Sequence, residues 1–355
     1  MRCVSATWDA NLSGERGNAL PRAICFGSAG ERLSAEERAF FAATDPLGFI
    51  LFRRNCASPE QVRALVAEFR DCVGRPDAPV LIDQEGGRVA RLQPPGWRRY
   101  PAAARLAALP DPDAEEAARL GARLIADDLA ALGVTVDCVP VLDLPAAGAD
   151  AVIGDRAFGS DPARVARLGR AVCEGMLAGG VLPVVKHMPG HGRARVDSHK
   201  ALPVVDASAA ALGESDFAPF RALADMPWAM TAHVVYSDID PERPATLSRR
   251  VIERVIRGAI GFDGVLLSDD IGMGALSGTL ADRVAGALGA GCDLVIQCSG
   301  ILGEMRESAE AALRLSPRTA DRLARGEALR VAARRDFDRR AAEARFDALV
   351  GVEAR

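Results

Sequence analysis

The chain has 355 residues, enough for two average domains but also within the range of one large α/β barrel. Hydrophobic residues make up 49% of it and charged residues 26%, which is typical of a folded globular protein and excludes a disordered one. The 44 basic and 48 acidic residues give a formal net charge of −4, so the overall charge does not favour nucleic acid or an anionic membrane as a partner. We expect a small neutral or mildly anionic ligand instead.

The chain carries no recognisable signal for export or membrane insertion. The first residues, MRCVSATWDANLSGERGNALPRA, lack the apolar core of a signal peptide, and no run of about 18 apolar residues occurs. The eight cysteines show no CxxC pair, which favours buried free thiols over disulfides or a zinc ribbon. They are Cys3, Cys25, Cys56, Cys72, Cys138, Cys173, Cys292 and Cys298. These features predict a cytoplasmic protein.

Eight short apolar or β-branched runs recur along the chain, with amphipathic segments between them. They cover residues 22–27, 48–55, 79–87, 134–144, 181–190, 228–236, 264–270 and 292–299. Near-continuous apolar strands that alternate with helices are typical of a parallel sheet buried on both faces. Eight such units favour a closed (β/α)8 TIM barrel in a single domain, because a doubly wound sheet usually has fewer strands and a GxGxxG turn after the first.

The segments between the strands carry helix signals. In residues 111–133, five Leu and Ile side chains fall on one face and Gly133 follows the last of them. Ser58 and Asp161 each precede a proline, and this pair predicts a helix N-cap. Residues 1–21 are expected to form a short lead. The Arg- and Ala-rich tail, residues 317–355, is expected to be helical with its charge on a solvated face.

Polar side chains stand at or after the ends of five predicted strands. Because the C-terminal ends of barrel strands meet at one rim, groups from distant parts of the chain would converge there and form a functional site. In chain order they are Asp83, Glu85 and Arg88, then Asp155 and Arg156, Lys186 and His187, His233, and Asp269 and Asp270.

Several of these side chains also have a purely structural interpretation. Asp270 could cap a helix that begins in IGMGAL, and His233 could be a hydrogen-bonded core histidine. Glu85 and Arg88 could pair locally. Asp269, the residue expected to face the barrel mouth, is harder to explain in this way.

Residues 186–199, KHMPGHGRARVDSH, contain three of the four histidines. One interpretation is a metal site with His187, His191, His199 and Asp197 as ligands, although the proline between the first two histidines prevents a regular helix. The other is a βα loop that carries Asp197 and His199 over the barrel mouth, where the carboxylate would fix the imidazole tautomer for proton transfer. Together with a strand-end carboxylate, that pair suits a two-step displacement at a sugar acetal carbon.

Four motifs occur together and in order: LIDQEGGRVARL at 81–92, VIGDRAFG at 152–159, KHMPGHGRARVDSH at 186–199 and LLSDDIGMGAL at 266–276. On these motifs the chain resembles the β-N-acetylglucosaminidases of glycoside hydrolase family 3, specifically the single-domain cytoplasmic enzymes of bacterial peptidoglycan recycling. The resemblance extends from about residue 22 to about 320. Met188, where the family often has Phe, and Gly272 depart from the pattern without changing a candidate catalytic atom.

The resemblance implies that Asp269 is the nucleophile and that His199, supported by Asp197, is the acid/base. It also implies five residues that hold the N-acetylglucosamine ring: Asp83, Arg91, Arg156, Lys186 and His187. The implied reaction is retaining hydrolysis of terminal, non-reducing β-linked N-acetylglucosamine, with N-acetylglucosaminyl-1,6-anhydro-N-acetylmuramyl peptides as the expected substrates. No metal or organic cofactor, no nucleic acid and no membrane is expected, and the protein should be a monomer or weak dimer.

Three alternatives stay open at this point. The barrel could be a metal-dependent hydrolase or lyase with His187, His191 and His199 as ligands. It could also be an inactive sugar-binding protein. Because a histidine acid/base lacks the permanent negative charge of Glu, phosphate could approach and the enzyme could be a phosphorylase. For His191 itself we expect a loop contact or a hinge role.

Overall fold

A closed barrel of parallel strands forms the centre of the computed structural model, which describes residues 19–351. The strands lie in the order β1, β12, β11, β9, β7, β6, β3, β2, and β1 pairs with both β12 and β2 to close the ring. They are β1 (Arg22–Phe26), β2 (Pro46–Leu51), β3 (Val80–Ile82), β6 (Val136–Asp137), β7 (Leu182–Met188), β9 (Trp228–Thr231), β11 (Val265–Asp270) and β12 (Leu294–Gln297). The predicted (β/α)8 barrel is confirmed, and each strand is shorter than its predicted run.

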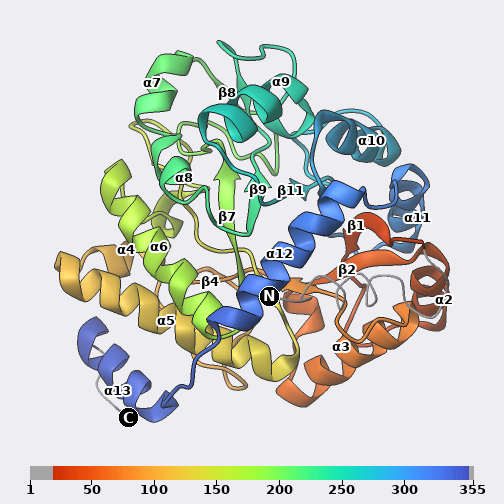
Figure 1. The fold of residues 1–355 in the computed structure, drawn as a ribbon, viewed down its shortest axis with the longest axis horizontal. Helices are drawn as coiled ribbons and strands as arrows, with labels where there is room; N and C mark the ends of the chain where they lie inside the picture. The colour runs from red at the N-terminus through yellow and green to blue at the C-terminus, as the bar shows by residue number, and fades with distance from the viewer. Residues whose placement is uncertain (1–18, 352–355) are drawn as a thin grey trace, which may run out of the picture.

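Helices surround the strands, as Figure 1 shows. They are α2 (Ala35–Thr44), α3 (Pro59–Val73), α4 (Ala103–Ala107), α5 (Asp111–Leu132), α6 (Pro162–Ala178), α7 (Ala209–Glu214), α8 (Ala218–Ala222), α9 (Arg249–Val251), α10 (Leu280–Ala290), α11 (Leu302–Ala311), α12 (Pro317–Ala333) and α13 (Arg339–Val350). A π-helical segment, η4 (Ile252–Ala259), continues α9, and three 3₁₀ turns are η1 (Arg53–Asn55), η2 (Gly154–Arg156) and η3 (Ala245–Leu247).

The helix boundaries follow the capping signals in the sequence. The Ser58 hydroxyl accepts the backbone N–H of Gln61 at the start of α3, and the Asp161 carboxylate accepts that of Ala163 at the start of α6. Helix α5 ends at Gly133, whose φ of 82° lies in the left-handed region that glycine adopts without steric cost. These three predictions are confirmed.

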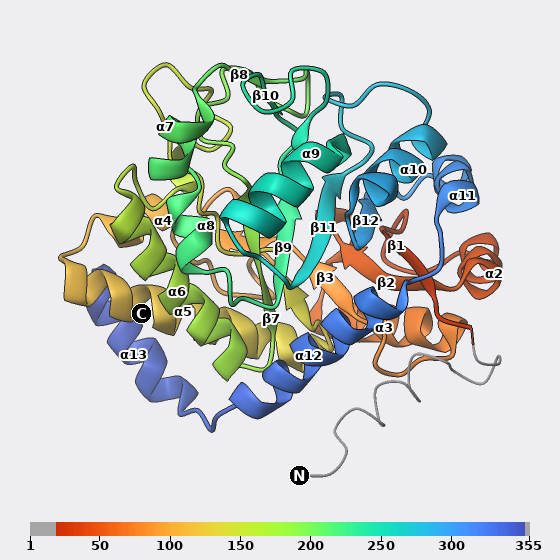
Figure 2. The same cartoon turned by 45° about the horizontal axis from the view of Figure 1, so that its top comes forward.

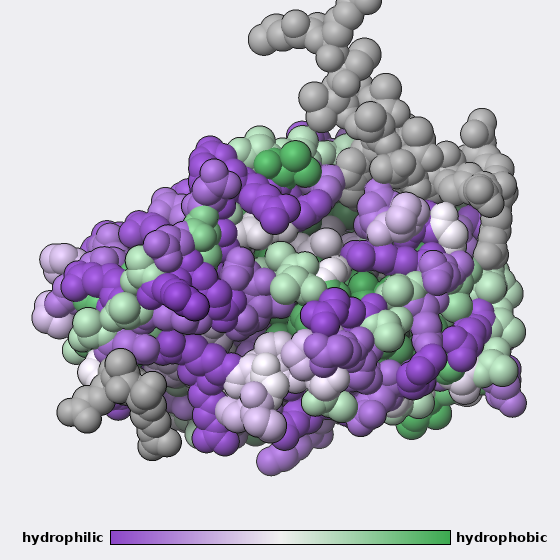
Figure 3. All heavy atoms as spheres, turned by 90° about the horizontal axis from the view of Figure 1, so that it is seen from below, coloured by the Kyte–Doolittle hydropathy of each residue, from purple (hydrophilic) through white to green (hydrophobic). Residues whose placement is uncertain are grey.

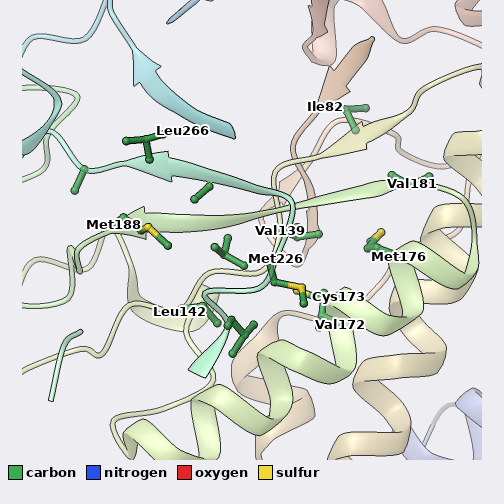
Figure 4. Close-up of a cluster of buried hydrophobic side chains, with 14 of the residues drawn as sticks. Ile82, Val139, Leu142, Val172, Cys173, Met176, Val181, Met188, Met226 and Leu266 are labelled. Carbon is green, nitrogen blue, oxygen red and sulfur yellow. The ribbon is translucent and has the colours of Figure 1, made fainter. Parts of the chain in front are cut away.

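The apolar core has two layers. Side chains such as Leu81, Val184 and Leu267 fill the barrel interior. A larger layer lies between the strands and the helices, and Figure 4 shows part of it, with Cys173 and Met176 of α6 beside strand residues. Close packing on both faces explains why the strands read as continuous apolar runs.

Two small sheets lie beyond the barrel. The antiparallel hairpin β4 (Gln84–Gly86) and β5 (Val89–Ala90) follows β3 directly. The parallel pair β8 (Val204–Val205) and β10 (Val235–Tyr236) lies at the upper end of the view in Figure 2, above β9 and β11. Both sheets therefore build on the loops that leave the C-terminal ends of the barrel strands.

The tail is helical within the described residues, and α12 covers the opposite, N-terminal end of the barrel (Figure 2). Its Ala320 and Leu323 join the cluster that fills the barrel interior. Arg322 is only 6% exposed and forms ion pairs with Asp263 and Asp293. The expectation of a solvated charged face is therefore wrong for Arg322, because α12 packs its polar side against barrel loops.

The cysteines largely follow the prediction. Cys25, Cys138, Cys173, Cys292 and Cys298 are buried free thiols, whereas Cys56 and Cys72 are only partly buried. Cys3 lies outside the described residues. Across residues 19–351 no helix combines the length and apolar character needed to span a bilayer. The face seen in Figure 3 is mostly hydrophilic, and its apolar patches are small and separated.

Candidate active site

A cavity of about 330 Å³ opens at the C-terminal ends of the barrel strands. Its lining includes seven of the eight predicted site residues, namely Asp83, Arg91, Arg156, Lys186, His187, His199 and Asp269. The eighth, Asp197, contacts His199 directly. The structure thus brings together side chains from β3, the loop after β6, β7 and β11, as expected for strand ends that meet at one rim of a barrel.

Lys186 is the centre of a buried ionic network on one wall of this cavity. Its Nζ lies 2.8 Å from Asp83 Oδ1 and 2.7 Å from Glu85 Oε1, and its side chain is 2% exposed. Arg91 contacts the other oxygen of Asp83 at 2.9 Å, and Arg156 binds both oxygens of Glu85 at 2.8 Å. Three cations therefore hold two carboxylates in fixed orientations.

The charges in this network shift each other's protonation equilibria. Burial by itself raises the pKa of Asp83, but the Lys186 ammonium and the Arg91 guanidinium outweigh it and hold that pKa well below its ordinary range. The pKa of Glu85 is lowered in the same way by Lys186 and Arg156, against the effect of burial. Both groups are carboxylates at neutral pH and can accept hydrogen bonds from sugar hydroxyls.

The β4–β5 hairpin positions Glu85 and Arg91. Gln84 Oε1 accepts the backbone N–H groups of Arg91 and Leu92, which ties the end of the hairpin to its start. A Cβ at Gly86, where φ is 93°, would lie 2.4 Å from a backbone carbonyl, so the turn requires glycine.

The interpretation of Glu85 and Arg88 as a local pair is wrong. Arg88 instead pairs with Asp155 at 3.0 Å, because the turn directs its side chain towards the loop after β6. Glu85 points to Lys186 and Arg156.

Asp269 lies one residue before the end of β11 and lines the cavity. Its Oδ1 accepts the backbone N–H of Asp270 at 2.8 Å. Burial raises the pKa of Asp269, but the neighbouring His233, His187 and Lys186 and the Asp270 N–H together lower it below its ordinary value. The group is therefore an ionised carboxylate, as a nucleophile must be.

Asp270 does not cap a helix, so that interpretation is corrected. Its Oδ1 accepts the backbone N–H groups of Gly272 at 3.0 Å and Cys298 at 3.1 Å, and the segment that follows is a turn. His233 is fully buried; its Nε2 donates to the Asp270 carbonyl at 2.9 Å and its Nδ1 lies 2.7 Å from Thr246 Oγ1. His233 is thus a hydrogen-bonded core histidine that holds the end of β11 in place.

Asp143 is a site residue that sequence reasoning missed. It is fully buried, its Oδ2 lies 2.6 Å from His187 Nδ1, and its Oδ1 accepts the His191 N–H at 2.6 Å. Burial raises the pKa of Asp143, but the opposing effects of His187 and His191 are larger. The pKa therefore lies below its ordinary value, and the group is ionised. The available signal was a lone Asp in the apolar run VPVLDL.

The His199–Asp197 pair lies on the loop after β7, at the cavity rim. His199 Nδ1 lies 2.8 Å from Asp197 Oδ1, which also accepts the His199 backbone N–H. The His199 side chain is 63% exposed and that of Asp197 is 20% exposed. Burial raises the pKa of Asp197, and its two hydrogen bonds from His199 lower it below its ordinary value. The geometry leaves the Nε2 edge of His199 unused by this pair.

The three histidines proposed as metal ligands bind three different partners. His187 contacts Asp143, His191 contacts Ser198 and His199 contacts Asp197. Among residues 19–351, no group of three or more His, Cys, Asp or Glu side chains is arranged to hold a metal ion.

Comparisons with known proteins show the family to which the chain is similar. Residues 20–320 match the glycosyl hydrolase family 3 N terminal domain. A β-hexosaminidase from Alkalilimnicola ehrlichii is 44% identical over 283 residues, covering 78% of this chain and 80% of that protein. A β-hexosaminidase from Pseudomonas aeruginosa is 42% identical over 287 residues, covering 80% and 83%.

Among solved structures, NagZ from Neisseria gonorrhoeae in complex with N-trifluoroacetyl-D-glucosamine is similar, with a TM-score of 0.82 and 34% identity over 93% of this chain and 98% of that one. The chain therefore belongs to glycoside hydrolase family 3 and is a glycoside hydrolase of the β-hexosaminidase type.

Proposed function

We propose that the protein is a retaining exo-β-N-acetylglucosaminidase that forms a covalent glycosyl intermediate on Asp269 and uses His199, paired with Asp197, as its acid/base. The observation that carries this proposal is that one cavity holds both a nucleophile candidate and an acid/base candidate. An ionised carboxylate lies on a rigid strand end, and an exposed imidazole with a carboxylate partner lies on the opposite loop.

The two steps follow from these positions. In the first, a carboxylate oxygen of Asp269 bonds to the anomeric carbon while the protonated His199 gives its proton to the departing glycosidic oxygen. In the second, His199 removes a proton from water, the water oxygen bonds to the anomeric carbon and the Asp269 ester bond breaks. Two inversions at one carbon give overall retention. Asp197 stabilises the imidazolium between proton transfers.

The ionic network supplies the sugar subsite in this proposal. Asp83 would accept hydrogen bonds from ring hydroxyls, while Lys186, Arg91 and Arg156 would donate to the remaining oxygens. His187, oriented by Asp143, presents its other ring nitrogen to the same cavity. Because these groups are already paired with one another, the site is preorganised before substrate enters.

For the cellular substrate we propose N-acetylglucosaminyl-1,6-anhydro-N-acetylmuramyl peptides in the cytoplasm. The β-hexosaminidase names of the relatives and the amino-sugar ligand of the gonococcal NagZ structure support an N-acetylated amino sugar at the scissile end. The resemblance to the enzymes of peptidoglycan recycling supports the aglycone.

Trapping the intermediate tests the proposal. A 5-fluoro N-acetylglucosaminyl fluoride should label the protein once, and peptide mapping should place the label on Asp269. Asp269→Asn should take up no label and should lose at least about 10³-fold in kcat. A label on Asp270 would contradict the nucleophile assignment.

Product analysis tests the acceptor. Hydrolysis predicts free N-acetylglucosamine of retained β-configuration as the first product, with or without phosphate in the buffer. A sugar 1-phosphate as the main product in phosphate would replace the hydrolase proposal by a phosphorylase.

A further inference from the structure

The loop that carries His199 is fixed at its base, and the His199 side chain at its tip is exposed. At the base, Gly192 lies so close to Leu144 that a Cβ would come within 2.0 Å of the Leu144 carbonyl oxygen. Arg193 forms an ion pair with Asp216 at 2.7 Å. At the tip, the His199 side chain projects into solvent. The position of His199 over the cavity therefore depends on what holds the segment between base and tip.

One side-chain contact spans that segment. His191 Nε2 lies 3.0 Å from Ser198 Oγ, and both residues are only 3% exposed. Ser198 is buried between Asp197 and His199, whose side chains are 20% and 63% exposed, and both Ser198 and His199 line the cavity. The backbone N–H of His191 donates to Asp143 Oδ1, so the His191 backbone is anchored to the loop that leaves β6.

The backbone of the same two tip residues is held from the other side. The Ala275 N–H donates to the Ser198 carbonyl at 3.1 Å, and the Gly274 N–H donates to the His199 carbonyl at 3.2 Å. These bonds come from the turn that follows Asp269 on β11. Within the described residues, the Ser198 hydroxyl is thus the one side-chain hydrogen bond between the tip and the base of this loop.

We propose that His191 and Ser198 form a latch that positions His199 over the scissile bond. The inference rests on the proposed function of His199 as the acid. His191 is a positioning residue in this view, since it touches the loop and its imidazole is held away from solvent. Breaking the latch would let the tip swing outward and would remove the acid from the leaving oxygen without altering Asp269.

The charge state of His191 is compatible with a lasting hydrogen bond to Ser198. Burial lowers the pKa of His191 to about 4, against the opposing effect of Asp143. A neutral imidazole pairs with a hydroxyl either as donor or as acceptor, so the contact persists throughout the neutral range. Its Nδ1 has no hydrogen-bond partner among the described residues, which leaves the Ser198 contact as the ring's hydrogen bond.

The test uses Ser198→Ala and two glycosides that differ only in leaving group. A general acid contributes about 10² to 10⁴-fold for a poor leaving group and little for an activated one. We expect Ser198→Ala to lower kcat/KM at least about tenfold on an alkyl or disaccharide substrate, and less than about threefold on a dinitrophenyl glycoside. Ser198→Thr, which keeps the hydroxyl, should restore most of the loss.

Variants of His191 give an independent test of the latch. The amide nitrogen of glutamine can occupy the place of His Nε2, so His191→Gln should retain more activity on the poor leaving group than His191→Ala. Ser308→Ala, which removes a buried serine hydroxyl on α11, is the matched control and should leave both rates unchanged. Thermal unfolding of every variant shows whether it is folded at the assay temperature.

His199→Ala separates the two proposals. If it shows the leaving-group effect and Ser198→Ala slows both substrates equally or neither, the latch is refuted while the proposed function stands. If His199→Ala itself slows both substrates equally, the acid assignment fails and the latch fails with it.

Discussion

Asp137 is a buried carboxyl group behind the ionic network, and no Lys or Arg side chain among residues 19–351 forms an ion pair with it. It is fully buried on β6; its Oδ1 accepts the Gln84 N–H at 2.9 Å, and its Oδ2 has no partner among the described residues. Burial raises the pKa of Asp137 to about 8, although the Gln84 N–H and Lys186 act in the opposite direction. At neutral pH the folded protein therefore holds a proton on this group that the unfolded chain releases.

This proton makes stability depend on pH in a defined direction. Because the folded-state pKa is raised, the group favours folding fully below its unfolded pKa of about 4, and this contribution is lost as pH rises to about 8. The limiting slope for one such proton is about −1.4 kcal/mol per pH unit. Asp137→Asn removes the titration and should gain stability relative to the natural protein by at least about 1 kcal/mol between pH 5 and pH 7.5.

Urea unfolding at several pH values measures this difference. Asp336→Asn, at an exposed position between α12 and α13, is the control and should give a flat difference. A flat difference for Asp137→Asn as well would mean that Asp137 is ionised in the folded protein.

At the scale of elements, α13 packs a buried aromatic side chain against α5, beside ion pairs such as Arg345–Glu116. Phe346 is fully buried against α5, and Arg98 stacks on its ring with the guanidinium carbon 5.2 Å from the ring centroid. Gly121 of α5 makes room for it, since a Cβ there would lie 2.9 Å from Phe346 Cε2. The three nearest atoms to that Cβ all belong to Phe346, so the ring alone requires glycine here.

This contact predicts a reversal of sign in a double-mutant cycle. Gly121→Ala should destabilise the natural protein by about 1 to 2 kcal/mol, because overpacking exceeds the gain of about 1 kcal/mol in helix propensity. Phe346→Ala should cost about 3 kcal/mol. In the Phe346→Ala background the clash is gone, and Gly121→Ala should become neutral or stabilising. Denaturant unfolding of the four proteins measures the coupling; equal costs of Gly121→Ala in both backgrounds would contradict it.

The elements also show where local sequence signals end. The capping pairs at Ser58 and Asp161 fixed two helix starts, because a cap depends on neighbouring residues only. The β8–β10 pair was not predicted: β8 lies outside the predicted strands, and β10 is the end of the run 228–236, which was assigned to the barrel. The segment after Asp270, where a helix cap was one interpretation, is a turn, and the Asp270 carboxylate accepts the backbone N–H of Cys298, just after β12.

For the whole molecule, the barrel and the rim could be predicted from the sequence, but the connections within the rim could not. The eight apolar runs predicted the barrel, and the C-terminal ends of barrel strands lie at one rim. Together these two points were sufficient to place Asp83, Lys186 and Asp269 at one end of the barrel. The pairing of Glu85 with Lys186 instead of Arg88 depends on the register of strands that are far apart in the sequence. Asp143 was missed because a carboxylate inside an apolar run reveals its role only through its partner, His187.

The two ends of the barrel each contain a buried cation, and only the one at the C-terminal end lies in the candidate active site. Arg322 at the N-terminal end and Lys186 at the C-terminal end are both buried cations that pair with two carboxylates each. Removing Lys186 takes a partner from two buried carboxylates, whereas removing Arg322 takes one from the buried Asp293 and one from Asp263, which is 63% exposed. Breaking a buried pair costs about 3 to 5 kcal/mol in comparable sites. Asp293 keeps Arg257 as a partner, so we expect the lower value for Arg322.

Arg322→Met and Lys186→Met should therefore both destabilise the protein, the first by less, and they should differ in activity. Arg322 lies at the end of the barrel opposite the cavity, so kcat/KM measured well below the unfolding temperature should stay within about twofold, because activity needs only the fold. Lys186→Met should lose at least about 10²-fold, since the sugar subsite loses a charged donor. Arg325→Met, which removes a pair whose arginine is 58% exposed, is the control and should change stability by less than about 1 kcal/mol. A loss of kcat/KM in folded Arg322→Met as large as that in Lys186→Met would show that the two ends of the barrel are coupled.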